Sequence, residues 1–115
     1  MYKSTVVSVV GSPTYVIESV STSSGTIGST FTMTPSGGVA PLTYAWVFTP
    51  SVGDGDIAIT SPTSASTTLT YSHLLYTGAE VQGTLTGTVT SSDGSTATVN
   101  INIQVSRDSG GGAPP

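Results

Sequence analysis

The chain has 115 residues, of which 7% are charged, and its formal net charge at pH 7 is −4. A chain of this length forms one domain and can bury a core without disulfides. Cysteine is absent from the sequence, which excludes a disulfide framework, a cysteine-based zinc site and thiol chemistry. Lys3 and Arg107 are the only basic residues, too few to neutralise phosphates, so we expect no nucleic-acid partner. No segment is apolar over the length of a membrane span, so we expect no membrane insertion.

Serine and threonine supply most of the polar groups, with 19 Ser and 21 Thr in the sequence. Threonine favours strands through its branched Cβ, while Ser, Gly and Pro favour turns. Residues that build helices are sparse, and no window shows the apolar period of an amphipathic helix. We therefore predict an all-β fold.

The first third of the chain predicts short strands separated by Gly, Pro and Ser. Residues 4–10 alternate valines, and we expect segment 1–13 to be an N-terminal arm or an extra strand. Residues 15–20 predict the next strand, and residues 21–28 predict a turn region. Phe31 and Met33 share a face of a further strand that ends at Pro35.

The stretch from Gly37 to Phe48 contains the only tryptophan, Trp46. Large side chains occupy every second position from Leu42, and because side chains alternate between the faces of a strand, they line one side. Tyr44 and Phe48 share the face of Trp46, which predicts that Trp46 fills the core of a small β-sandwich. The alternative, an exposed Trp that stacks on a sugar, is disfavoured by these neighbours. We expect the strand to stop at Pro50.

The second half predicts strands at residues 57–59, 67–71, 80–90 and 97–105. The pair Asp93-Gly94 marks the tip of a hairpin between the last two. Glycine inside a strand usually has a close neighbour, so we expect Gly87 to leave room for the Trp46 indole across the two sheets. A bulge or kink is the alternative.

Together these segments predict a sandwich of two antiparallel sheets with about seven to eight strands. We expect residues 14–106 to form the sandwich and residues 107–115 a flexible Gly/Pro-rich tail. The predicted core consists of Phe31, Tyr44, Trp46, Phe48, Leu85, Val89, Ile101 and Ile103.

Two segments carry a family resemblance. Residues 44–48, Tyr-Ala-Trp-Val-Phe, resemble the Tyr-x-Trp-x-Phe strand of immunoglobulin-like domains of the PKD or bacterial Ig-like type, and residues 88–95 resemble their last hairpin. Val47 differs from the acidic residue of that family, and Val81 or Gly83 stands where many Ig domains have a corner tyrosine. The resemblance implies an Ig-like sandwich. Similar cysteine-free domains decorate tailed-phage virions, and others belong to bacterial surface proteins and polysaccharide-degrading enzymes.

Few residues point to chemistry. Asp54 and Asp56, two residues apart in a Gly-rich loop, fit the start of a calcium loop, although its later ligands are missing. An ordinary acidic turn is the alternative, and we expect no other cofactor. His73, the only histidine, has no Cys or second His nearby, and we expect it to be solvated or structural. Motifs for a nucleophile, a carboxylate pair or a phosphate loop are absent, so we predict no enzyme activity.

Two features favour binding. Thr84 to Thr90 on one strand, and Asn100, Asn102 and Gln104 on the next, offer uncharged hydrogen-bonding faces. Few charges protect the edge strands, so we expect that another chain can pair with them. A hydroxyl-rich face that only contacts solvent is the alternative.

We therefore expect a non-enzymatic structural or interaction module. From the resemblance, and from an N-terminus that lacks the pattern of a secretion signal, we expect it on the tail or capsid surface of a phage virion. There it would mediate assembly, decoration or weak host adhesion, with other virion proteins, copies of itself or cell-surface glycans as partners. The alternative is a carbohydrate-binding or adhesin domain of a bacterial surface or secreted protein. Glycan contacts are then predicted at Tyr15, Tyr71 and Tyr76.

Overall fold

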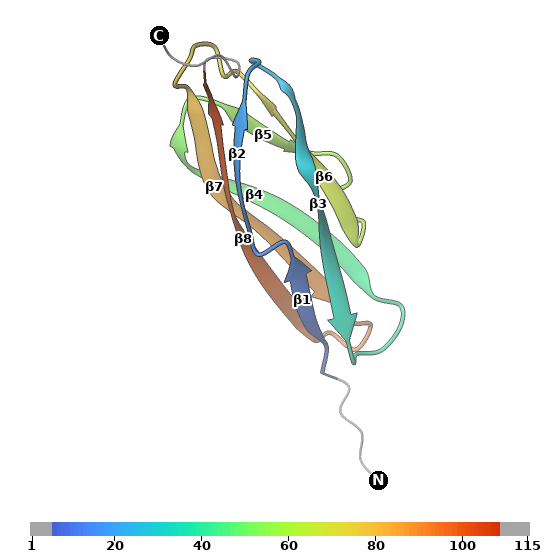
Figure 1. The fold of residues 1–115 in the computed structure, drawn as a ribbon. Coiled ribbons are helices and arrows are strands. Elements are labelled where there is room, and N and C mark those ends of the chain that lie inside the picture. Colours follow the sequence, from blue (N-terminus) through green and yellow to red (C-terminus); the bar gives the residue numbers. More distant parts are fainter. Residues whose placement is uncertain (1–5, 109–115) are drawn as a thin grey trace.

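The computed structural model describes residues 6–108, which form eight β-strands in two four-stranded sheets (Figure 1). The predicted all-β sandwich is therefore confirmed. No helix that could span a membrane is found among these residues. The strands are β1 (Ser8–Ser12), β2 (Tyr15–Val20), β3 (Gly25–Ser36), β4 (Thr43–Gly53), β5 (Asp56–Ile59), β6 (Ser66–Ser72), β7 (Glu80–Thr90) and β8 (Thr96–Arg107).

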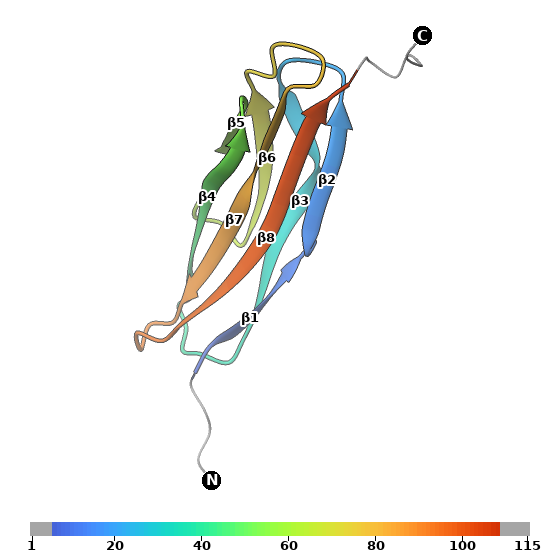
Figure 2. The same ribbon diagram turned by 90° about the vertical axis from the view of Figure 1, so that its left-hand side faces the viewer.

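The strand order is β1-β3-β6-β5 in one sheet and β2-β8-β7-β4 in the other (Figure 2). All pairs are antiparallel except β2 and β8, which run parallel from Tyr15 opposite Asn102 to Val20 opposite Arg107. This pair departs from the expected antiparallel arrangement. The chain leaves the first sheet after β1. β2 then joins the edge of the second sheet and runs in the same direction as its neighbour β8.

Several strand boundaries differ from the predicted ones, although β2 and β7 match them. β1 pairs with β3, so part of the expected arm or extra strand belongs to a sheet of the sandwich. β3 begins at Gly25, within the predicted turn region, because Gly25 pairs with Tyr71 before the register shifts. β4 continues past Pro50 to Gly53. Pro50 lies on an edge strand, where a residue without an N–H is tolerated. Most of the predicted tail lies outside the described residues.

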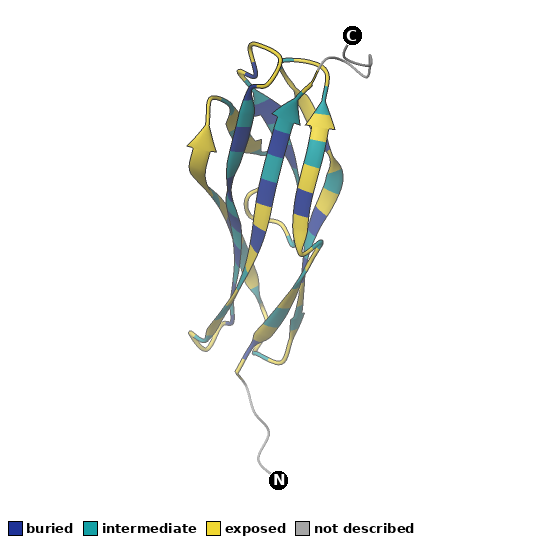
Figure 3. Cartoon of the chain, turned by 60° about the vertical axis from the view of Figure 1, so that its left-hand side comes forward, coloured by how far each residue is buried: buried dark blue, intermediate teal, exposed yellow. Residues whose placement is uncertain are grey.

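The core lies between the sheets, and buried residues alternate with less buried ones along the strands (Figure 3). Six of the expected core side chains are buried, namely Phe31, Trp46, Leu85, Val89, Ile101 and Ile103. Tyr44 and Phe48 are partly buried and pack against this core. Because every second side chain of a strand points into the core, the side chains between them lie on the outside of the sandwich.

Trp46 lies directly opposite Gly87 on the neighbouring strand β7. A Cβ atom on Gly87 would lie 2.8 Å from Cζ3 of the indole and 2.8 Å from Sδ of Met33. The glycine thus leaves room for the indole, but the two residues belong to the same sheet, which corrects the expectation of a contact across the sandwich. Trp46 Nε1 donates a 2.7 Å hydrogen bond to the Ser64 carbonyl oxygen, so its one polar atom is satisfied.

Hydrogen bonds from a few polar side chains close the two ends of the sandwich. At one end the buried Ser91 hydroxyl accepts a 2.7 Å bond from the Val39 N–H, which ties loop 37–42 to the β7–β8 turn. At the other end Arg107 Nη1 donates a 2.7 Å bond to the Leu74 carbonyl oxygen. Each end of the sandwich thus has a loop that is tied to the strands by a side-chain hydrogen bond.

Candidate functional site

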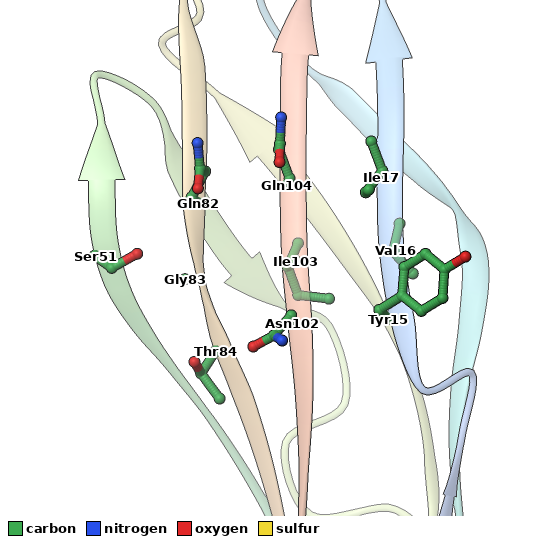
Figure 4. Close-up of a pocket in the computed structure, with 10 residues that line it drawn as sticks. All are labelled: Tyr15, Val16, Ile17, Ser51, Gln82, Gly83, Thr84, Asn102, Ile103 and Gln104. Atoms are coloured by element: carbon green, nitrogen blue, oxygen red, sulfur yellow. The ribbon is translucent and has the colours of Figure 1, made fainter.

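The β2-β8-β7-β4 sheet has one face toward the core and one toward the outside, hereafter the outer face. The outer face carries the side chains that alternate with the core side chains along each strand. Strand register aligns them in two rows that run across β2, β8 and β7. One row contains Ile17, Gln104 and Gln82, and the other contains Tyr15, Asn102 and Thr84 (Figure 4). Residues far apart in the sequence therefore meet on one surface.

A hollow of about 360 Å³ lies on this face. Its lining comes from all four strands and consists of Tyr15, Val16, Ile17, Ser51, Gln82, Gly83, Thr84, Asn102, Ile103 and Gln104. The register shift between Pro50 and Val52 places Ser51 at the β4 side, with its hydroxyl pointing toward β7 (Figure 4). No charged side chain is among the lining residues, so the hollow offers hydrogen bonds from neutral groups.

The amides of Asn102 and Gln104 make no hydrogen bond to any residue within 6–108, while Gln82 Nε2 donates to Glu80 Oε2 at 2.5 Å. A neutral amide can donate through its nitrogen and accept through its oxygen. These two side chains are exposed or half-buried on the central strand β8. They are therefore available to a ligand.

Two apolar side chains flank the amides on β2. Tyr15 is 62% exposed and Ile17 is 68% exposed. Figure 4 shows the Tyr15 ring nearly face-on when the sheet is viewed from outside. An exposed aromatic face of this kind can stack against a flat apolar surface of a ligand.

Comparison with known proteins identifies no relative. No family model, curated protein or solved structure matches this chain. The function must therefore be inferred from the geometry of the outer face.

The predicted glycan-contacting tyrosines occupy three different environments. Tyr15 lines the hollow, as described above. Tyr71 is 5% exposed and its hydroxyl lies 2.8 Å from Thr22 Oγ1, so the expectation of a glycan contact there is corrected. Tyr71 shares the inward parity of Leu69 on β6, and this signal was present in the sequence. Tyr76 is exposed in the loop between β6 and β7, and it does not line the hollow.

The acidic residues of the Gly-rich loop contact two different side chains. Asp54 Oδ2 accepts a hydrogen bond from the Tyr76 hydroxyl. Asp56 Oδ2 lies 2.6 Å from His73 Nδ1 in an exposed pair. Within the described part of the chain, no three His, Cys, Asp or Glu side chains form a group that could hold a metal ion. The contacts are those of an acidic turn that is tied to the following loop, and they add no third ligand to the predicted calcium site.

The Asp54–Tyr76 contact predicts a titration that can be measured. The hydrogen bond to Asp54 raises the pKa of Tyr76 above its ordinary value of 10.0, with desolvation and the negative charge of Asp54 acting in the same direction. Because the pKa of Tyr76 is raised in the folded state, the contribution of this contact to stability is fully present below the pKa of the unfolded chain. It is lost as pH rises through the folded pKa. We expect Asp54→Asn to lower the pKa of Tyr76.

The absorbance of tyrosinate measures this titration, and the variant Tyr76→Phe identifies which part of the signal belongs to Tyr76. An unchanged Tyr76 titration in Asp54→Asn would mean that the hydrogen bond does not form in solution.

Proposed function

We propose that the chain is a non-enzymatic interaction module that binds a partner through its outer face. The observation that carries this proposal is the uncharged hollow, where the Asn102 and Gln104 amides have no partner among the described residues. No acidic side chain lines the hollow. The lining residues include no His, Asp, Glu, Cys or Lys, which are common general acids and bases, so this arrangement favours binding over acid–base chemistry.

We further propose that the module is Ig-like. In immunoglobulin-like sandwiches, strands A, B, E and D form one sheet, and strands C, F and G form the other. The order β1-β3-β6-β5 matches the first sheet, and β4, β7 and β8 take the places of C, F and G. This strand order supports the resemblance of residues 44–48 and 88–95, although a shared fold does not fix a function.

From that resemblance we propose a place on the tail or capsid surface of a phage virion, where the module serves assembly, decoration or host adhesion. The test is an antibody raised against the purified chain and applied to phage particles banded from lysates of its source. We expect the antibody to label the particles, and mass spectrometry to find peptides of the chain in the band. Peptides found only in the unassembled fraction would contradict the virion proposal.

A carbohydrate-binding or adhesin domain of a bacterial surface or secreted protein is the second candidate. The observation that favours it is the exposed Tyr15 ring beside unpaired amides. In that case the same antibody would detect the chain on the cell envelope or in the culture medium, and the banded particles would lack it.

A further inference from the structure

We infer that the outer-face hollow binds an uncharged glycan, with a sugar ring stacked on Tyr15 and its hydroxyls bonded to Asn102 and Gln104. This inference rests on the proposed interaction role of the outer face and is independent of a place in the virion.

The aromatic part of the site is Tyr15. Its ring lies at the β2 side of the hollow, is 62% exposed and turns its face outward (Figure 4). The face of an aromatic ring carries partial negative charge, and the C–H groups on one side of a sugar ring carry partial positive charge. Stacking therefore needs a flat exposed ring, and polar groups beside the ring are needed to bond the sugar hydroxyls. Tyr15 and Asn102, its partner on the neighbouring strand, have this arrangement.

The polar part of the site consists of amides and hydroxyls. Each sugar hydroxyl both donates and accepts, and so do the amides of Asn102 and Gln104 and the hydroxyls of Ser51 and Thr84. The ten lining residues include no cation. An acidic glycan would lose hydration there without gaining an ion pair, which costs free energy. The chemistry of the hollow therefore selects an uncharged glycan.

The shape of the site favours an extended chain. Lining residues come from four neighbouring strands, which lie about 4.8 Å apart and so span roughly 14 Å. Polar groups recur on successive strands along this line, from Ser51 on β4 to Asn102 on β8. A single sugar covers only part of this distance, so we expect the affinity to increase from a monosaccharide to an oligosaccharide.

The position of the hollow argues against a peptide strand. A peptide that extends a sheet needs a free backbone edge. The hollow is centred on β8 and β7, and each of these strands is paired on both sides, β8 with β2 and β7, and β7 with β8 and β4. No backbone edge is therefore available at its centre, and a ligand must be held by side chains.

The test is electrophoresis of the purified full chain in native gels that contain a neutral polysaccharide, with mannan, dextran and a mixed-linkage glucan as separate probes. Gels with alginate provide the acidic comparison. We expect at least one neutral probe to retard the chain and alginate to have no effect. Casein added as a competitor tests whether a polypeptide takes the same site.

Four variants locate the binding. Tyr15→Ala should weaken binding about tenfold, because it removes the stacked ring, and Asn102→Ala should weaken it about fivefold, because it removes a hydrogen-bonding amide. Tyr15→Phe keeps the ring and should bind nearly as the original chain does. Tyr76→Ala is the matched control, since Tyr76 is 54% exposed and lies outside the hollow. Circular dichroism confirms that each variant is folded.

Four results would overturn the inference: no retardation by any neutral probe, retardation by alginate alone, binding that Tyr15→Ala leaves intact, or displacement by casein. These failures differ from failure of the virion proposal. A chain present on banded particles but not retarded by neutral polysaccharide overturns only the glycan inference. A chain retarded through Tyr15 but absent from particles supports the glycan inference and removes the place in the virion.

Discussion

Replacing Gly83 by alanine is expected to destabilise the sandwich by about 3 kcal/mol, near the upper end of the usual cost of overpacking. A Cβ atom at this position would overlap the Phe48 ring and the Thr49 carbonyl oxygen, and it would lie 2.9 Å from the Pro50 Cα. Two of these neighbours are backbone atoms of β4, which cannot move without disturbing the β4–β7 pairing. Urea unfolding followed by circular dichroism measures the change in the free energy of unfolding.

Gly87→Ala should cost less, about 1–2 kcal/mol, because its close neighbours are the Met33 and Trp46 side chains, which can shift slightly. The matched control is Gly28→Ala, since a Cβ there would meet only Glu18 Oε1 at an ordinary 3.6 Å. We expect this control to be neutral or to stabilise the fold by up to about 1 kcal/mol. Equal costs at the three glycines would contradict the tight packing of β4 on β7.

Truncation of Trp46 to alanine is expected to lower the free energy of unfolding by about 3–5 kcal/mol. The indole is 3% exposed and belongs to the main core cluster, so its removal leaves a cavity between the sheets. Trp46→Phe keeps much of the volume but loses the bond from Nε1 to the Ser64 carbonyl oxygen, which contributes about 1 kcal/mol. The loss of unfolding free energy in Trp46→Phe should therefore be smaller than that in Trp46→Ala and larger than that in the surface control Val47→Ala.

Val47→Ala is the control for Trp46, because Val47 is the next residue on β4 and is 58% exposed. Changes at such surface positions usually stay within about 0.5 kcal/mol. Circular dichroism again gives the unfolding curve, since the only tryptophan is absent from Trp46→Ala and Trp46→Phe. A Trp46→Ala cost as small as that of Val47→Ala would show that the indole is not a core group.

Much of the fold could be predicted because its local patterns are strong. Strict alternation over residues 80–90 gave the bounds of β7, and the large side chains around Trp46 gave the inward face of β4. The start of β3 at Gly25 was missed because a Ser/Thr/Gly segment has the composition of a turn. The parallel pairing of β2 with β8 joins residues far apart in the sequence, and no local pattern specifies it.

The candidate site was predicted only in pieces. The polar faces with Thr84, Asn102 and Gln104 were recognised from alternation, and Tyr15 was proposed separately as a glycan contact. Only the register of β2 on β8 places Tyr15 beside Asn102. The contribution of Ser51 depends on the register shift in β4 beyond Pro50, where we expected the strand to stop.

The most direct test of the outer face as the binding surface is hydroxyl-radical footprinting of the tyrosines, with the chain alone and with its partner bound. The partner is the banded particle or the polysaccharide that retards the chain. Tyr15 and Tyr76 are similarly exposed, 62% and 54%, so they start with comparable reactivity, and the buried Tyr71 serves as an unreactive reference. We predict that binding reduces oxidation of Tyr15 severalfold and leaves Tyr76 unchanged. Protection of Tyr76 with Tyr15 still reactive would show that the partner binds the β6–β7 loop, and it would contradict the assignment of the outer face.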